Sequence, residues 1–382
     1  MILKDTGNFD MDSIVQSFCM DGEIVEIRVY GSGHINDTFL LTNSDSGNPD
    51  YLLQRINHYV FKDVPGLINN IDLVTAHLKK KMPLGLGENV NQKVLSLIPA
   101  KDGKLFYKDE DGNYWRVYLF LSGSRSYDIV STEIQAYECG KAFGFFQSLL
   151  SDMDPALLSE TIADFHNIHK RLADFHQAVE QDSMNRLSSL IAEVQFITER
   201  EQAMSVIYQW GQAGLLPKRI THNDTKFNNV LFDQNDKVKC VIDLDTVMAG
   251  YVAYDFGDAI RTIINSASED EPDLYKIQLN MHLFKAYTQG YINKSIGFLE
   301  EKEIESLYQG VMLFPYMQGV RFLTDYLQGD TYYKIAYPEH NLIRTKAQLQ
   351  LLVKLEEQSE AINQIISEAV TANKTIHKEK VT

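Results

Sequence analysis

Residues 221–258 read THNDTKFNNVLFDQNDKVKCVIDLDTVMAGYVAYDFGD, and the rest of the chain is best understood as positioning this segment. It contains His222, Asp224 and Asn229 in the order H-x-D-x-x-x-x-N, and Asp243 follows a second apolar run. In phosphoryl transfer, one carboxylate orients the attacking hydroxyl, while an amide oxygen and a second carboxylate hold magnesium. Mg²⁺ prefers hard oxygen ligands and commonly takes only one or two from side chains. The pattern therefore predicts Asp224 as the proton acceptor and Asn229 and Asp243 as metal ligands.

The local pattern predicts a β-hairpin between the two proposed metal ligands. Residues 230–232 form a short apolar run, residues 233–237 a polar turn, and residues 238–242 a second run with β-branched character. Such a hairpin places Asn229 and Asp243 at the same rim. The alternative is that Asp224 is a turn residue, His222 a packed core histidine and Asp243 an ordinary strand terminus. The spacing, the hairpin and the second carboxylate together favour the catalytic interpretation.

Composition limits the classes of function. The chain has 382 residues, which is long enough for two lobes. Its content of 44% hydrophobic and 23% charged residues is that of a globular protein. The formal net charge of −16 argues against nucleic acid as a partner. Three scattered cysteines suggest neither a disulfide framework nor a zinc cluster. Without a signal-peptide pattern or a long apolar window, we expect a cytoplasmic protein with no membrane contact.

Hydrophobic periodicity predicts an α+β protein with two lobes. The first part is rich in strands around one helix, and the second part is mainly helical. We expect a nucleotide-binding lobe at 1–121, a connector at 122–129 and a helical lobe at 130–382, with a nucleotide in the cleft between the lobes. The expected strands are 23–30, 38–42, 51–56, 94–97, 105–107 and 114–121, and the expected helices are 10–20, 65–81, 132–150, 164–180, 183–214, 273–292, 299–327 and 341–370. Residues 372–382 are expected to be a frayed tail.

A glycine-containing loop lies between the first two expected strands. Gly31 and Gly33 allow a backbone to approach a phosphate closely, or simply make the turn. The third glycine of a kinase-type G-x-G-x-x-G is replaced by Asn36. His34 and Asn36 can both donate and accept hydrogen bonds. They are therefore candidates to contact the acceptor, although Asn36 also tolerates a left-handed turn.

The lysine that protein kinases place on a neighbouring strand is absent. In those enzymes it contacts the nucleotide phosphates and pairs with a helix glutamate. The corresponding strand here is Tyr51-Leu-Leu-Gln-Arg-Ile56, and helix 65–81 has no glutamate. Gln54 or Arg55 must substitute, and strand alternation allows only one of them to face the cleft.

Three further polar features occur in the sequence. Asp255, in the sequence YDFGD, is expected to accept hydrogen bonds from the catalytic loop, including His222, and to begin the helix that holds Arg261. Asp245 is a candidate second metal or substrate ligand. The histidines in DFHNIHKRLADFH, residues 164–176, lack the HExxH arrangement of a zinc site and are expected to be helix-surface or interhelical residues.

With these residues in view, the sequence resembles the aminoglycoside phosphotransferase and choline kinase superfamily. This resemblance implies a protein-kinase-like two-lobe fold, with a small antiparallel-sheet N-lobe and a larger, mainly helical C-lobe. Within it, the chain is similar to the N-acetylhexosamine 1-kinases. The blocks that carry this resemblance are GSGHINDTFLLT, YLLQRIN, YWRVYLF, RITHNDTKFNNVLFD, VIDLDTVMAG, YDFGDAIR, GVRFLTDYLQGDTYY and YPEHNLIRTKAQLQL. One departure from the narrower group is Thr262, where an aromatic residue is expected.

The resemblance implies ATP- and Mg²⁺-dependent phosphorylation of the anomeric C1 hydroxyl of GlcNAc or GalNAc by a monomer or small homo-oligomer. It implies Asp224 as the base, with Asn229 and Asp243 as magnesium ligands. Other implied positions are nucleotide contacts at Gly31, Gly33, Gln54, Phe120 and Leu121, sugar contacts at His34, Asn36, Arg261, Arg321 and Tyr332, and structural support from His222 and Asp255. Two alternatives stay open: a kinase for choline, ethanolamine, homoserine or an aminoglycoside, and a nucleotide-binding pseudokinase.

Overall fold

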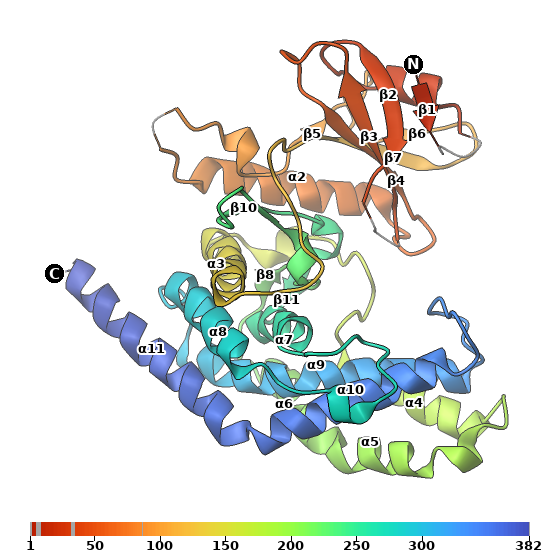
Figure 1. Ribbon diagram of the computed structural model, residues 1–382, viewed down its shortest axis with the longest axis vertical. Coiled ribbons are helices and arrows are strands. Elements are labelled where there is room, and N and C mark those ends of the chain that lie inside the picture. The colour runs from red at the N-terminus through yellow and green to blue at the C-terminus, as the bar shows by residue number, and fades with distance from the viewer. Residues whose placement is uncertain (1, 5–8, 32–34, 86, 382) are drawn as a thin grey trace. The chain divides into compact units, whose positions relative to one another are not determined.

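The computed structural model describes residues 2–4, 9–31, 35–85 and 87–381 (Figure 1). The chain divides into two compact units. The first consists of Met1–Ser126, Asp152–Ala163 and Leu231–Met248, and the second of Tyr127–Ser151, Asp164–Val230 and Ala249–Thr382. Two later segments of the chain thus belong with the N-terminal sheet, including the one that contains Asp243. The lobe boundaries expected from the sequence stay a prediction.

The first unit is built on a seven-stranded sheet with the order β1-β2-β3-β4-β7-β5, in which β6 also pairs with β7. All pairings are antiparallel except that of β1 with β2. Alternate residues such as Leu41, Leu53 and Val117 are buried, as expected for a sheet with one covered face. The strands are β1 (Ile2–Lys4), β2 (Ile24–Val29), β3 (Asp37–Asn43), β4 (Tyr51–Ile56), β5 (Leu97–Ile98), β6 (Tyr107–Lys108) and β7 (Tyr114–Leu119).

Two helices in this unit begin at side-chain caps. In α1 (Met11–Gln16), the Asp10 carboxylate accepts from the backbone N–H of Ser13. In α2 (Val64–Lys81), Asp63 accepts from Gly66, and three lysines occupy the last turn, where cations interact favourably with the helix dipole. The unit also contains the short 3₁₀ helices η1 (Val90–Gln92), η2 (Pro155–Leu157) and η5 (Leu244–Thr246).

The hairpin expected between the proposed metal ligands is present. Strand β9 (Val230–Phe232) pairs with β10 (Val238–Val241) in a two-stranded sheet. Asn229 directly precedes β9, and Asp243 follows β10 by two residues. Asp233 stabilises the turn because its carboxylate accepts from the backbone N–H groups of Asn235 and Lys237.

The second unit is mainly helical. Its helices are α3 (Glu133–Leu150), α4 (Ile168–Gln181), α5 (Ile191–Met204), α6 (Val206–Gln212), α7 (Val252–Ile263), α8 (Met281–Ser295), α9 (Glu301–Leu327), α10 (His340–Glu357) and α11 (Ser359–Val381), with η3 (Leu187–Ser189), η4 (Phe227–Asn229) and η6 (Leu274–Lys276). The short strands β8 (Arg219–Thr221) and β11 (Met248–Gly250) pair with each other. Figure 1 shows α9 and α10 running alongside one another.

Small residues let the central helices approach closely. A Cβ atom added at Gly140 on α3 would lie 2.1 Å from the carbonyl oxygen of Tyr287 on α8. At Gly257 on α7 it would lie 2.2 Å from the carbonyl oxygen of Gly310 on α9. Any larger residue would force these helices apart, so the glycines fix the close packing of α3 on α8 and of α7 on α9.

The sequence predicted the antiparallel N-terminal sheet and the helical C-terminal region correctly, but several details were wrong. It missed β1 and the β8–β11 pair, because three-residue strands leave no periodic signal. Segments 183–214 and 341–370, each expected as one helix, are interrupted at Ser205 and Gln358. The expected frayed tail is helical to Val381.

Candidate active site

The loop after β8 turns sharply at Asn223, which has a left-handed backbone with φ 65°. His222 is fully buried, and its ring lies edge-on to Phe143 and Phe146 of α3 at centroid distances of 5.5 and 5.8 Å. His222 Nδ1 accepts a 3.3 Å hydrogen bond from the backbone N–H of Asp224. The histidine therefore anchors the loop from within the helical core.

Asp255, in the first turn of α7, anchors the same loop through hydrogen bonds. Its Oδ2 accepts from the backbone N–H of His222 at 2.9 Å, and its Oδ1 accepts from that of Asn223 at 2.7 Å. Gln147 Nε2 adds a 2.7 Å bond, and the Thr225 hydroxyl donates to the Asp255 carbonyl oxygen. Burial raises the pKa of the Asp255 carboxyl group. The hydrogen bond expected between Asp255 and the catalytic loop is thus present.

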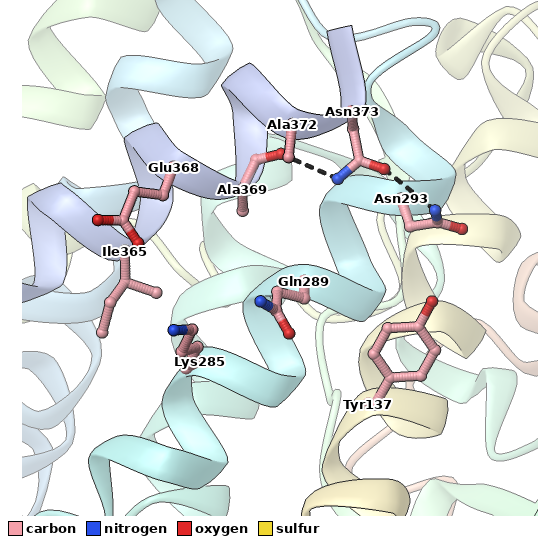
Figure 2. Close-up of a pocket in the computed structure, with 9 residues that line it drawn as sticks. All are labelled: Tyr137, Lys285, Gln289, Asn293, Ile365, Glu368, Ala369, Ala372 and Asn373. Atoms are coloured by element: carbon pink, nitrogen blue, oxygen red, sulfur yellow. Dashed lines mark hydrogen bonds between the residues drawn. The ribbon is translucent and has the colours of Figure 1, made fainter. Parts of the chain in front are cut away.

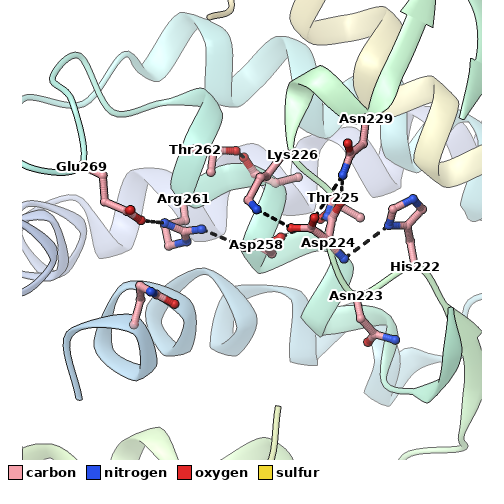
Figure 3. A network of polar contacts seen from close by, with 12 residues as sticks. His222, Asn223, Asp224, Thr225, Lys226, Asn229, Asp258, Arg261, Thr262 and Glu269 are labelled. Atoms are coloured by element: carbon pink, nitrogen blue, oxygen red, sulfur yellow. Dashed lines mark hydrogen bonds and ion pairs between the residues drawn. The ribbon is translucent and has the colours of Figure 1, made fainter. Parts of the chain in front are cut away.

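Asp224 projects from this fixed loop with its side chain 22% exposed. Lys226 Nζ lies 2.8 Å from its Oδ1, and Asn229 Nδ2 donates to its Oδ2 at 3.2 Å (Figure 3). Burial acts to raise the pKa of Asp224, but the charge of Lys226 and these hydrogen bonds outweigh it, so the pKa lies below its usual range. Asp224 is therefore an ionised carboxylate, available to accept a proton.

The Asn229 side chain is oriented by the same contacts. Its Nδ2 donates to the Asp224 carbonyl oxygen at 2.8 Å as well as to the carboxylate. Within the described part of the chain, both of these side-chain hydrogen bonds are donated by Nδ2, which leaves Oδ1 available. An unused amide oxygen beside an ionised carboxylate fits a hard cation such as Mg²⁺. Asp243, the other proposed ligand, belongs to the first unit, where it is exposed and has a left-handed backbone with φ 60°.

The buried part of the network continues along α7. Thr225 N–H donates to Asp258 Oδ2 at 3.0 Å, and Arg261 reaches Asp258 at 3.2 Å and Glu269 at 2.8 Å (Figure 3). Arg261 is buried and paired with both carboxylates, so its role in this structure is to tie α7 to the segment around Glu269. The expected sugar contact of Arg261 stays a prediction.

Arg321 and Tyr332, both expected at the acceptor, do lie together in the second unit. The Arg321 guanidinium is 5.9 Å from the Tyr332 ring centroid, 5.5 Å from that of Tyr333 and 5.7 Å from that of Phe165. The Tyr332 backbone N–H donates to Asp325 Oδ1, and its side chain is exposed. These residues form an aromatic surface around a guanidinium group.

A second arginine, which the sequence analysis missed, adjoins this surface. Arg171 Nη2 donates to the backbone carbonyl of Phe165 at 3.0 Å, and its buried Nε has no partner among the described residues. Burial and the neighbouring charge of Arg321 lower the pKa of Arg171. Within the described ranges, neither guanidinium forms an ion pair with a carboxylate. Two arginines without an ion-paired carboxylate therefore adjoin these aromatic rings.

In the first unit, the side chains of Gln54 and Arg55 point to opposite faces of the sheet. Gln54 Nε2 donates to Thr38, and its Oε1 accepts from Arg116 on β7. Arg55 points to the other face, where it pairs with Asp37 at 2.5 Å and lies over the Phe9 ring. Of the two candidates for the missing lysine, Gln54 alone therefore shares a face with the segment that bears Asp243.

Some of the residues expected to contact the nucleotide lie in the described part of the chain. Gly31 has a left-handed backbone with φ 80°, as a tight turn requires, whereas Gly33 and His34 lie outside the described residues. The Phe120 ring meets that of Tyr30 edge-on at 5.6 Å, and Leu121 is buried. Contacts between these residues and a nucleotide stay a prediction.

Asn36 makes structural contacts. Its Nδ2 donates to Asp245 Oδ2 at 2.7 Å, and its Oδ1 accepts from the backbone N–H of Asn57 at 2.9 Å. Asp245 is buried and also pairs with Arg116. The sequence predicted Asp245 as a candidate second metal or substrate ligand, but in the structure its carboxylate is bonded to Asn36 and Arg116. The contact expected between Asn36 and the acceptor stays a prediction.

Three charged residues in these contacts were not predicted from the sequence: Lys226, Arg116 and Arg171. Two of them leave a readable signal. Lys226 lies two residues after the proposed base, and Arg116 is the one charge in the strand sequence YWRVYL. The histidines of segment 164–176 form no metal cluster, since the described part of the chain contains no group of three potential His, Cys, Asp or Glu ligands.

A separate cavity of about 380 Å³ lies among α3, α8 and α11. Figure 2 shows Lys285 and Gln289 on α8 facing the side chains of α11, and the hydrogen bond between Asn293 and Asn373. None of the proposed catalytic or acceptor residues lines it. We therefore place the active site elsewhere.

In the described ranges, no helix is long and apolar enough to cross a bilayer.

Comparison with known proteins bears on the fold and the family. An aminoglycoside phosphotransferase from Alicyclobacillus acidocaldarius superposes with a TM-score of 0.56 at 13% identity, covering 95% of this chain and 96% of that one. Amicoumacin kinase in complex with AMP-PNP, Ca²⁺ and Ami gives 0.56 at 12%, with coverages of 90% and 93%. A choline kinase from Cryptosporidium parvum gives 0.54 at 15%, with coverages of 91% and 93%.

These similarities confirm the protein-kinase-like fold that the sequence predicted. The model of the phosphotransferase enzyme family (APH) matches residues 26–291, a range that contains the whole catalytic segment. The broader resemblance is thereby confirmed, while the narrower one to N-acetylhexosamine kinases stays a prediction. Because the match extends over well more than half of the chain, this protein belongs to the phosphotransferase enzyme family, whose activity is ATP-dependent phosphoryl transfer to a small molecule.

Proposed function

We propose that the protein phosphorylates the anomeric C1 hydroxyl of an N-acetylhexosamine, GlcNAc or GalNAc, with ATP as the phosphoryl donor. The observation that carries the catalytic part is the Asp224 carboxylate, ionised and held beside the unused amide oxygen of Asn229. The sugar is supported by the sequence resemblance and by the two arginines of the acceptor surface, the name used for Phe165, Arg171, Arg321, Tyr332 and Tyr333. Amicoumacin kinase, similar in fold, has been seen with AMP-PNP and Ca²⁺.

The reaction forms one P–O bond and breaks another. Asp224 orients the C1 hydroxyl toward the γ-phosphorus and accepts its proton as the new O–P bond forms and ADP departs. An anomeric hydroxyl is more acidic than an ordinary alcohol, so a carboxylate with a low pKa is a sufficient base. Magnesium, held by Asn229 and Asp243, would offset charge that develops on the phosphate oxygens. Lys226, ion-paired with Asp224, provides a further positive charge beside the attacking oxygen.

The acceptor surface favours a neutral sugar over a cationic acceptor. Sites for choline and other quaternary ammonium ions use aromatic cages, and cations in general need negative charge or π faces free of competing cations. Here the aromatic rings of Phe165, Tyr332 and Tyr333 already surround the guanidinium of Arg321, with Arg171 adjacent. Guanidinium N–H groups suit ring hydroxyls and an acetamido carbonyl, and they repel an ammonium group.

An acceptor panel tests this proposal. Purified protein with Mg²⁺ and ATP is assayed for ADP release with GlcNAc, GalNAc, glucose, choline, ethanolamine, homoserine and an aminoglycoside. We expect turnover with the two N-acetylhexosamines, and a product identified as the sugar 1-phosphate by ³¹P NMR. Turnover with only a cationic acceptor would show that this acceptor, and not a sugar, is the substrate. ATP binding without ADP release for any acceptor would identify a pseudokinase.

A further inference from the structure

Arg116 is a buried arginine on β7 with an unusual set of partners. The residue is 1% exposed and lies directly across from Gln54 in the β4–β7 pairing. Its Nε donates to Gln54 Oε1 at 3.0 Å. Its two terminal nitrogens donate to the two oxygens of Asp245, at 2.5 and 2.9 Å. The planar fork of arginine matches a carboxylate in this bidentate way, which a lysine cannot reproduce.

Asp245 joins three segments of the first unit. It lies in η5, two residues after Asp243. Besides Arg116 it accepts a hydrogen bond from Asn36, at the end of the glycine-containing loop, and Asn36 is in turn bonded to the backbone of Asn57 after β4. One buried carboxylate thus links the sheet, the glycine loop and the turn that presents Asp243.

The turn at Asp243 needs such support. Its φ and ψ of 60° are left-handed, a conformation that residues other than glycine adopt only when the surroundings impose it. The next residues of the turn are buried, and Asp245 is the one among them that carries charge. A buried carboxylate without its partner is strongly unfavourable, so loss of Arg116 would displace Asp245 and release the turn.

We propose that Arg116 is a positioning residue for the proposed metal ligand Asp243. It acts through Asp245 to preset the Asp243 carboxylate for the metal, and does not itself contact phosphate. Three of its N–H donors are occupied by Gln54 and Asp245, and the side chain is buried. This inference rests on the proposed function in one respect, because it takes Asp243 to be a metal ligand.

The test measures metal binding directly. Mn²⁺ is titrated into the full-length protein in the presence of AMP-PNP and followed by electron paramagnetic resonance. AMP-PNP binding without metal is measured separately by calorimetry. For Arg116→Met, we expect Mn²⁺ affinity to fall by about tenfold or more, the range typical of residues that orient metal ligands, with metal-free AMP-PNP affinity unchanged. Arg116→Lys, which keeps the charge but not the fork, should fall between the wild type and Arg116→Met.

A second variant separates positioning from folding. Arg116→Met combined with Asp245→Leu removes both charges, and replacing a buried ion pair by apolar side chains commonly preserves stability. We expect this double variant to melt near the wild-type temperature while its Mn²⁺ affinity stays low. Arg55→Met is the matched control, because this arginine lies on the neighbouring strand and pairs with Asp37 on the other face. It should bind Mn²⁺ as the wild type does.

Three outcomes would overturn the inference: unchanged Mn²⁺ affinity in Arg116→Met, wild-type affinity in the double variant, or a loss of metal-free AMP-PNP binding, which would mean direct phosphate contact. Failure of the proposed function would give different results. The wild-type protein itself would not bind Mn²⁺ with AMP-PNP, or Asp243→Asn would bind Mn²⁺ as well as the wild type does.

Discussion

Lys226 Nζ lies 2.8 Å from Asp224 Oδ1, so the proposed base carries its own counter-ion two residues along the chain. The pair is held in place because His222 and Asp255 fix the loop from the helical core. A carboxylate kept ionised next to a positive charge can accept a proton while the ammonium group faces the developing negative charge. The following predictions test this arrangement and the structure that supports it.

Asp224→Asn should lower kcat by at least about 10²-fold, because the amide cannot accept the proton of the attacking hydroxyl. Binding of AMP-PNP should persist, since the substitution leaves the nucleotide contacts intact. Steady-state ADP release and calorimetry measure the two effects. Asp174→Asn, which alters a helix-surface ion pair with Lys170, serves as the control. Near-normal turnover in Asp224→Asn would remove Asp224 from the role of base.

Lys226→Met should lower kcat by about 10²-fold, the usual effect of removing one group that stabilises transition-state charge. Lys226→Arg retains the charge and should lose considerably less. The comparison is made at saturating ATP and acceptor. If both variants lost activity equally, the geometry of the ammonium group would matter more than its charge, and if neither did, Lys226 would be a surface ion pair only.

Arg321→Met should raise KM for the acceptor by tenfold or more with little change in KM for ATP, since a pocket that hydrogen-bonds a substrate group loses that contact specifically. Arg171→Met should act in the same direction, because the two guanidinium groups adjoin the same Phe165. Arg200→Met, on α5, whose guanidinium pairs with Glu356 and lies over the Phe196 ring, is the control. An equal rise in KM for both substrates would instead indicate a general loss of structure.

His166 should make the protein sensitive to acid. Burial lowers its pKa to about 4, with Asp258 favouring the charged form and Arg321 and Arg171 opposing it. Because the folded-state pKa lies below the unfolded value of about 6.5, its contribution is fully present above pH about 6.5 and is lost as pH falls toward about 4. The loss amounts to about 3 kcal/mol at about 1.36 kcal/mol per pKa unit.

Urea unfolding measured between these pH values checks this prediction. His166→Gln should show a shallower decrease in the free energy of unfolding with falling pH than the wild type. His169→Gln replaces an exposed histidine of the same segment and should keep the wild-type slope. An identical slope in all three proteins would contradict the assignment to His166.

Gly257→Ala should destabilise the protein by about 1–3 kcal/mol or more, because overpacking a tight helix contact forces the backbones apart. The added Cβ would lie 2.2 Å from the Gly310 carbonyl oxygen, which cannot rotate away. Thermal melting measures the change. Gly85→Ala, where the nearest side-chain atom would lie at 3.5 Å, is expected to have little effect. A neutral Gly257→Ala would mean that α7 and α9 can separate at low cost.

The sequence alone determined the features that depend on local spacing. The H-x-D-x-x-x-x-N order placed Asp224 and Asn229 in one loop, and the polar turn between two apolar runs gave the hairpin β9–β10. Alternating and helical periodicities separated an antiparallel sheet from a helical region, because each regular element must bury one face. Strands of three residues, and breaks inside long helical patterns, carry too few residues to be read in this way.

Only the tertiary structure decided which charges meet. Arg116 and Asp245 are 129 residues apart, and Arg171 and Arg321 lie on different helices, so no local pattern relates them. The same is true of the choice between Gln54 and Arg55, which was made by the partners on each face of the sheet. Buried charges are tolerated only where folding supplies their partners, and those partners come from anywhere in the chain.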